Sequence, residues 1–162
     1  MIGFRSLLVV LAVLCGHAYA DTLLGLVVGV ADGDSITVLG AERQQHKIRL
    51  AGIDAPEKNQ PFGQKSKASL SSMVFGKRVK VEWTKRDRYQ RIIGVVLVNG
   101  VDSNLEQVKA GMAWWYRQYA KEQTAPQRAA YEVAENQAKA GRVGLWVDAN
   151  PVAPWEFRHR KK

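Results

Sequence analysis

Acidic residues and an arginine gather in two short, turn-like segments of this chain. The first segment is Asp32-Gly-Asp34, and the second begins fifteen positions later at Arg49 and continues to Asp54-Ala-Pro-Glu57. Carboxylates alone repel a polyanion, but carboxylates that hold a divalent cation beside arginines attract a phosphodiester and polarise it. We therefore expect an ion and phosphate site where the two segments meet.

Residues 1–20 have the pattern of a secretory signal peptide. Arg5 gives a short positive start, residues 7–14 form an apolar run, and Ala18-Tyr-Ala20 matches a cleavage site of small residues. The apolar run is about half the length that spans a bilayer, and no later stretch is apolar for long enough. We therefore expect a secreted or periplasmic protein that is cut after Ala20 and has no membrane contact afterwards.

Cys15 is the only cysteine in the chain. Lipidation of Cys15 is the alternative to simple cleavage, but Leu14 precedes it where a lipoprotein signal needs a small residue. After cleavage the chain has no thiol, so disulfides and zinc binding through sulfur are excluded.

The formal charge is +9, and loss of Arg5 with the signal peptide lowers it to +8. A surface this positive concentrates polyanions and speeds their capture. Charge alone does not choose among nucleic acid, anionic lipid and cell-wall polymers. The length predicts one ordinary domain, and we expect a monomer because no amphipathic face is left over.

Five short segments rich in β-branched and aliphatic residues predict strands. Asn99-Gly100, after the last of them, is a strong signal for a two-residue hairpin. Five short strands favour a small barrel. The strands are expected at residues 23–30, 35–39, 46–51, 79–83 and 92–98.

Three helices are expected between and after these strands. The first covers about residues 64–75. The second begins with the capping box Ser103-Asn-Leu-Glu106, and the third begins with another capping box at Thr124 and stops at Gly141. Five strands together with three helices predict an α+β fold that is mainly β.

The end of the chain, residues 151–162, is a candidate tail after a domain at residues 21–150. Pro151 and Pro154 make it stiff, and a basic run starts at Arg158. The basic run could help to hold nucleic acid. Terminal charge runs are usually solvated and disordered, so we favour a solvated, disordered chain end over a nucleic-acid-binding role.

Three motifs stand in a fixed order, and together they resemble the staphylococcal-nuclease type of thermonuclease. The resemblance covers nearly all of the chain after residue 20, up to Gly144-Leu-Trp146. It implies a five-stranded oligonucleotide-binding-type barrel with three α-helices. The motifs are Asp32-Gly-Asp34-Ser, Arg49 followed by Ile53-Asp54-Ala-Pro-Glu57, and Asp87-Arg-Tyr-Gln-Arg91-Ile-Ile-Gly94.

The resemblance implies that one calcium ion is bound by the side chains of Asp34 and Asp54 and by the backbone carbonyl of Ala55. Calcium takes about six to eight oxygens in flexible geometry, so water and a phosphate oxygen would complete the shell. Taken singly, Asp34 reads as a turn residue and Asp54 as a cap. Taken together, the two are better explained as ligands.

The resemblance also assigns the catalytic roles. Glu57 would be the general base that faces the attacking water. Arg49 and Arg91 would grip the non-bridging oxygens of the scissile phosphate as negative charge builds in the transition state. Lysine would replace either arginine poorly, because a planar fork matches two phosphate oxygens and an ammonium does not.

An outer nucleotide pocket is implied at Arg88, Tyr89, Tyr116 and Tyr119. There the family holds a neighbouring phosphate and stacks a base. Stacking accepts any base, so we expect broad sequence preference. The loop at residues 58–62 is shorter than in the best-known member of the family. A shorter loop over the pocket would hold the terminal nucleotide of the substrate less well.

The combined hypothesis is a calcium-dependent phosphodiesterase that acts on DNA and RNA and leaves 3′-phosphate ends. The same barrel also serves proteins that only bind nucleic acid, so a non-catalytic binding module is the first alternative. The retained carboxylates and arginines argue against it. A cationic structural protein is the second alternative, and it leaves the three motifs unexplained.

Overall fold

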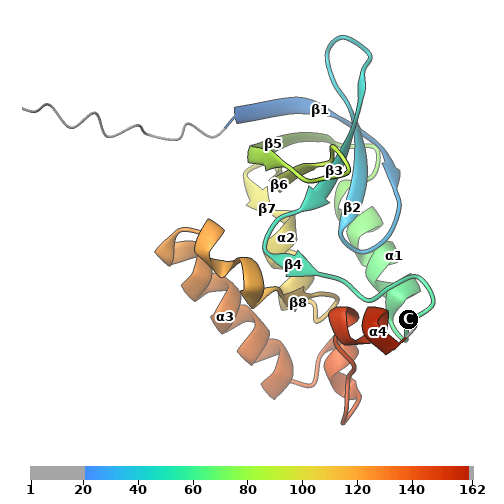
Figure 1. Ribbon diagram of the computed structural model, residues 1–162, viewed down its shortest axis with the longest axis vertical. Coiled ribbons are helices and arrows are strands. Elements are labelled where there is room, and N and C mark those ends of the chain that lie inside the picture. Colours follow the sequence, from blue (N-terminus) through green and yellow to red (C-terminus); the bar gives the residue numbers. More distant parts are fainter. Residues whose placement is uncertain (1–20, 161–162) are drawn as a thin grey trace, which may run out of the picture.

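The structure is a computed structural model that describes residues 21–160. The predicted signal peptide, including Cys15, lies outside the described residues. Figure 1 shows a β-barrel at one end of the molecule and α-helices packed around the other end. No helix within residues 21–160 is long and apolar enough to cross a membrane.

Five strands form the barrel, as predicted. Neighbouring strands are antiparallel in the order β3-β2-β1-β5-β6, and a parallel pairing of β3 with β6 closes the ring. In that pairing Ile48 lies opposite Ile92 and Arg49 lies opposite Ile93. The strands are β1 (Asp21–Val30), β2 (Ser35–Leu39), β3 (Gln45–Leu50), β5 (Arg78–Arg86) and β6 (Ile92–Val98).

The predicted hairpin after β6 is also present. Asn99 and Gly100 both have positive φ angles, 50° and 81°, and this conformation matches the twist of a two-residue hairpin. The hairpin turns the chain into the short strand β7 (Val101–Asp102), which pairs with the end of β6. The chain then enters α2 (Ser103–Lys109) directly.

One apolar core fills the barrel and continues beneath the helices. Alternate residues of the strands point inward, such as Ile36 and Val38 of β2. Leu70 of α1 (Gly63–Val74) and Val108 of α2 are fully buried against them. The helices and the barrel therefore form a single domain with one main core.

The three predicted helices are confirmed, with one correction at the start of α2. The cap of α2 is Asp102, whose carboxylate accepts hydrogen bonds from the backbone N–H groups of Asn104 and Leu105. The predicted capping box at Ser103 is wrong by one residue, because Asp102 already satisfies these donors. The capping box at Thr124 is confirmed and begins α3 (Ala125–Ala140).

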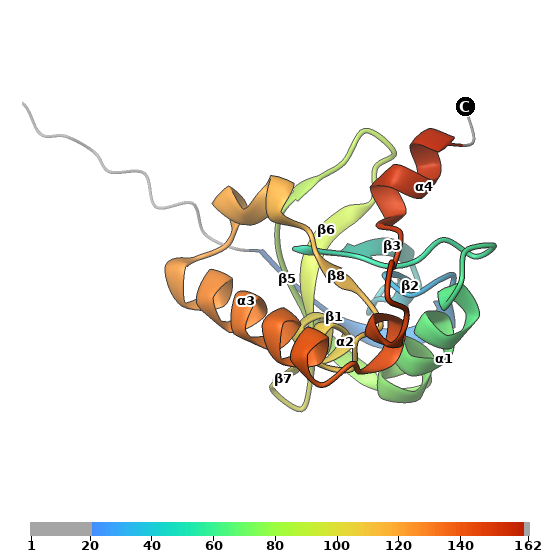
Figure 2. The same cartoon turned by 90° about the horizontal axis from the view of Figure 1, so that it is seen from below.

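The expected disordered tail is also corrected, because residues 154–160 form a fourth helix, α4 (Pro154–Arg160). Pro154 begins it, Glu156 lies in its first turn and basic residues lie in its last turn; all three features favour a helix. In Figures 1 and 2, α3 and α4 lie on opposite sides of β8 (Trp114–Trp115). Strand β8 pairs with β4 (Ile53–Asp54).

Two buried amides on α2 hold the loops that carry the acidic motifs. Asn104 accepts a hydrogen bond from the backbone N–H of Val96 and donates to the carbonyls of Ala51 and Gly94. Gln107 donates to the carbonyl of Gly33 at 2.8 Å. Both amides are fully buried, so they give buried backbone groups of these loops hydrogen-bond partners away from water.

Replacement of Asn104 by alanine should destabilise the fold. The Val96 N–H and the Ala51 carbonyl would lose the partner that Asn104 provides, whereas the Gly94 carbonyl would still accept from the Ala51 N–H. Each buried polar group left unsatisfied costs about 1–3 kcal/mol. We expect a fall of about 3 kcal/mol in the free energy of unfolding, measured by urea denaturation. Lys109→Gln, on the exposed side of α2, should change it by less than about 0.5 kcal/mol. Equal stability of the two variants would contradict this role for Asn104.

Candidate active site

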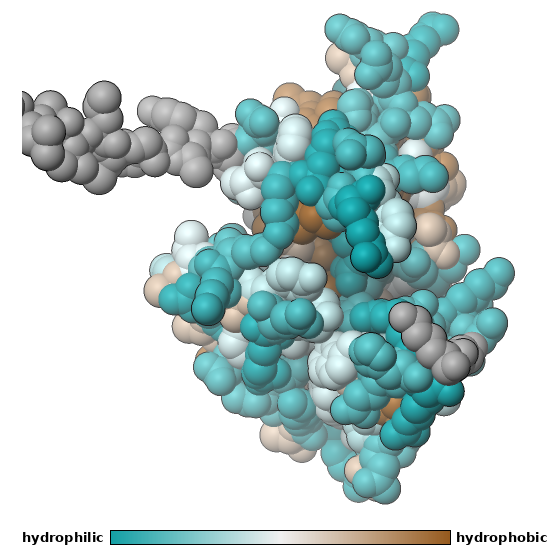
Figure 3. Space-filling model, in the orientation of Figure 1, coloured by the Kyte–Doolittle hydropathy of each residue, from teal (hydrophilic) through white to brown (hydrophobic). Residues whose placement is uncertain are grey.

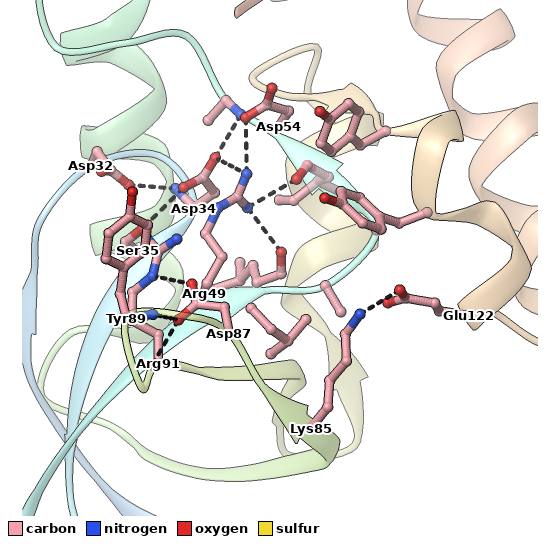
Figure 4. Close-up of a pocket in the computed structure, with 18 of the residues that line it drawn as sticks. Asp32, Asp34, Ser35, Arg49, Asp54, Lys85, Asp87, Tyr89, Arg91 and Glu122 are labelled. Carbon is pink, nitrogen blue, oxygen red and sulfur yellow. Dashed lines mark hydrogen bonds and ion pairs between the residues drawn. The ribbon is translucent and has the colours of Figure 1, made fainter. Parts of the chain in front are cut away.

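A pocket of about 710 Å³ opens where β3, β4 and the loop before β6 meet. Figure 4 shows side chains from these segments turned toward one another. Every site residue predicted from the sequence lines this pocket. Those residues are Asp34, Arg49, Asp54, Ala55, Glu57, Arg88, Tyr89, Arg91, Tyr116 and Tyr119.

Asp34 and Asp54 converge on one nitrogen of Arg49. The Arg49 Nη2 atom lies 3.2 Å from Asp34 Oδ2 and 2.9 Å from Asp54 Oδ1. The other nitrogen, Nη1, donates to the backbone carbonyls of Leu50 and Ile53, so the guanidinium is fixed in place. Both aspartates are buried, and buried carboxylates need cationic partners of this kind.

The pKa of Asp34 reflects this crowding. Burial raises it to about 7, and the neighbouring carboxylates of Asp32 and Asp54 add to the rise. The Arg49 guanidinium and the backbone N–H of Ala55 act in the opposite direction. The raised pKa means that Arg49 alone does not fully compensate the negative charge of the Asp34 carboxylate. A bound divalent cation would supply the missing positive charge.

The backbone of Ala55 is tied to the same carboxylate. Its N–H donates to Asp34 Oδ2 at 2.7 Å, which brings the segment after β4 against the Asp32-Gly-Asp34 turn. The donors present are therefore two carboxylates and a neighbouring backbone carbonyl, all hard oxygens. Within residues 21–160 no group of three or more histidine, cysteine or acidic side chains could hold a metal ion. Two carboxylates and one backbone carbonyl fit calcium, which would take water and substrate oxygens as its other ligands. They do not fit zinc, which prefers nitrogen and sulfur ligands.

Gly33 allows this close approach. A Cβ atom on Gly33 would lie 1.8 Å from Ser66 Oγ and 2.8 Å from the Cβ of Ala55. Ser66 is itself held by a hydrogen bond to the carbonyl of Met112 at 2.6 Å. Any larger residue at position 33 would therefore push the Asp34 turn away from Ala55.

Arg91 reaches the pocket from the loop at residues 87–91, where Asp87 organises the backbone. The Asp87 carboxylate accepts from the N–H groups of Tyr89 and Arg91 and from Arg91 Nε, the last at 2.7 Å. Slight burial raises the pKa of Asp87, but these hydrogen bonds outweigh it and hold the pKa below its usual value. Asp87 is therefore an ionised anchor that aims Arg91.

Aromatic side chains line the outer part of the pocket. Tyr116 and Tyr119 meet edge to face with ring centres 5.1 Å apart, and Arg88 lies over the ring of Tyr89. Tyr89 and Tyr119 are well exposed. Trp155 of α4 stacks on Tyr116 with its ring 5.2 Å away and nearly parallel.

Glu57 and Arg158 form a contact that the sequence analysis missed. Arg158 of α4 donates to both oxygens of Asp54, at 3.2 and 2.7 Å, and to Glu57 Oε1 at 2.8 Å. The hydrogen bonds to Asp54 raise the pKa of Arg158 most. Pro154, as the first residue of a helix with an acidic first turn, was the signal that could have placed Arg158 on a folded element.

Hydrophilic residues cover most of the face shown in Figure 3, which has a hollow between the barrel and the helices. Lys85 and Arg86 line the pocket together with Arg49, Arg88, Arg91 and Arg158. A cationic rim around buried carboxylates attracts a polyanion and leaves the acids for chemistry at its centre.

Comparison with known proteins finds a family and relatives that cover most of the chain. Residues 47–148 match the family described as staphylococcal nuclease homologue. A Haemophilus influenzae protein named as an uncharacterized endonuclease is 45% identical over 136 residues, which cover 84% of this chain and 73% of that protein. A Shigella flexneri protein named micrococcal nuclease is 40% identical over 154 residues, which cover 90% of this chain and 85% of that protein.

The chain therefore belongs to the staphylococcal nuclease family. Its enzyme class is nuclease, a hydrolase of nucleic-acid substrates. The predicted fold class and family are both confirmed.

Replacement of Gly33 by alanine should displace Asp34 and lower nuclease activity. A misplacement of about 1 Å in a catalytic group can cost about 100-fold in rate, and we expect a loss of that order together with about 1–3 kcal/mol of stability. Gly29→Ala is the matched control, because a Cβ there meets its neighbours at an ordinary 3.6 Å. Rate and stability should be measured by cleavage of a labelled strand and by urea denaturation. Full activity of Gly33→Ala would contradict the steric argument.

Proposed function

We propose that this nuclease is a calcium-dependent phosphodiesterase that cleaves DNA and RNA and leaves 3′-phosphate ends. The observation that carries the proposal is the convergence of Asp34 and Asp54 on Arg49 in a pocket that also contains Glu57 and Arg91. The relative named micrococcal nuclease supports it.

Calcium would be held by the Asp34 and Asp54 carboxylates and the Ala55 carbonyl. When bound there, it would neutralise the phosphate and make the attacking water more acidic. The two carboxylates and the Ala55 backbone are already drawn together by the Ala55 N–H. Little rearrangement of the barrel would be needed to receive the ion.

Arg49 and Arg91 would contact different oxygens of the scissile phosphate. Asp87 fixes the Nε atom of Arg91, and among residues 21–160 its Nη1 and Nη2 atoms donate no hydrogen bond. That fork is available to two phosphate oxygens. Arg49 is held beside Asp34 and Asp54 by four hydrogen bonds or ion pairs. Because these aspartates would hold the cation, Arg49 would contact the phosphate oxygen nearest to the cation.

Glu57 would accept a proton from the attacking water. Its backbone N–H donates to Gln60 Oε1 at 3.1 Å, which holds the turn after Pro56, and its side chain is 40% exposed. A carboxylate in this position reaches water directly. The attack at phosphorus in line with the 5′ oxygen would then release that oxygen and leave the phosphate on the 3′ side.

The aromatic rim would hold the nucleotide beside the scissile bond. Tyr89, Tyr116 and Tyr119 offer ring faces on which any base can stack, and Arg88, which lines the same pocket, would contact a neighbouring phosphate. The groups at the site would contact backbone and base faces rather than base edges, so we propose cleavage with little sequence preference and a preference for single strands or breathing duplex. We further propose an exported monomer, from the pattern of residues 1–20.

Removal of the base or of the phosphate fork should abolish most of the activity. Glu57→Gln and Arg91→Lys should each lower the rate of cleavage by about 100-fold or more, measured on a supercoiled plasmid and on a labelled single strand. Wild-type cleavage should require calcium and stop with a chelator. Glu82→Gln and Arg78→Lys, both outside the pocket, should retain wild-type rates.

Two results would contradict the proposed function. Cleavage that continues in a chelator would exclude calcium as the cofactor. Tight, salt-sensitive binding of nucleic acid without cleavage by the wild type would indicate a binding module that has lost catalysis.

A further inference from the structure

The segment at residues 151–160 is attached to the active site at three points. Gln60, in the turn beside Glu57, donates to the carbonyl of Val152 at 2.6 Å. Trp155 lies against Trp114 and stacks on Tyr116. Arg158 completes the attachment with its contacts to the acids.

Arg158 takes the positions on Asp54 that a metal ion would use. Asp54 Oδ1 accepts from both Arg49 and Arg158, and Asp54 Oδ2 accepts from Arg158 at 2.7 Å. The same guanidinium contacts Glu57 Oε1. Since both oxygens of Asp54 already face cationic donors, a calcium ion bound to Asp54 must compete with Arg158.

Trp155 covers one face of Tyr116, a ring on which a base could stack. Its ring lies 9° from the plane of Tyr116 at 5.2 Å, which is the geometry of a base stacked on an aromatic residue. Tyr116 lines the pocket. Helix α4 therefore covers one proposed calcium ligand and one stacking ring of the site at the same time.

The attachment is suited to release. Arg158 has a side chain that is 42% exposed, and Trp155 is only half-buried. Neither residue belongs to the barrel core. The side chains of Trp155 and Arg158 can therefore leave the site without exposing the barrel core.

We propose that α4 is a built-in inhibitor whose Arg158 guanidinium occupies Asp54, a calcium ligand, and Glu57, the general base, until calcium displaces it. This inference rests on the proposed function, because it assumes that Asp54 is a calcium ligand. The consequence is a nuclease that stays closed where calcium is scarce. High calcium opens it, because a divalent ion between Asp34 and Asp54 replaces a single positive charge.

Calcium affinity measured by titration calorimetry on the full chain tests the proposal. Arg158→Gln should bind calcium about tenfold more tightly than the wild type, because the competing state is removed. Trp155→Ala, which loosens the same helix, should also tighten binding. Arg160→Gln is the matched control: it removes the same charge from the same helix but no contact with the acids, so its affinity should equal that of the wild type.

Cleavage rates give an independent reading. At limiting calcium Arg158→Gln should cut faster than the wild type, and at saturating calcium the two rates should converge. Calcium binding of equal strength in both proteins, or a slower rate for Arg158→Gln at saturating calcium, would overturn the inhibitor and leave the proposed function intact. Absence of calcium binding and of calcium-dependent cleavage in both proteins would overturn the proposed function and the inhibitor together.

Discussion

Two buried carboxylates that face one another need positive charge between them, and much of this structure meets that need. Asp34 and Asp54 are nearly inaccessible to solvent, and burial raises the pKa of Asp34 to about 7. Arg49 supplies one positive charge from β3, and Arg158 supplies another from α4. Two buried carboxylates side by side are costly for a fold, and the cation site proposed above would give this arrangement a function.

The barrel closure explains why the other groups arrive at the same place. Because β3 and β6 run parallel, Arg49 near the end of β3 lies beside Ile93. Arg91 immediately precedes Ile92, the first residue of β6, so it reaches the same end of the barrel. Buried amides on α2 then fix the neighbouring turns through the carbonyls of Gly33 and Ala51. The site therefore lies at the closing seam of the barrel, where the pairing of β3 with β6 brings the two arginine-bearing segments together.

The sequence predicted what local pattern and motif spacing encode. Alternating strands, the Asn99-Gly100 hairpin and the capping box at Thr124 are each decided within a few residues. The placement of Arg158 is different, because its partners lie more than a hundred positions earlier in the chain. No local pattern carries that contact, and a basic chain end normally favours solvent. Asp102 displaced Ser103 as the cap of α2 for a local reason, since a carboxylate one residue earlier accepts from the same donors.

A crystal structure with calcium and a short oligonucleotide carrying a hydrolysis-resistant linkage would test the central claim most directly. The account predicts one calcium ion bound by Asp34, Asp54 and the Ala55 carbonyl, with a phosphate oxygen on the ion and Arg91 on the same phosphate. Calcium bound elsewhere, or a phosphate seated away from the two aspartates, would contradict it.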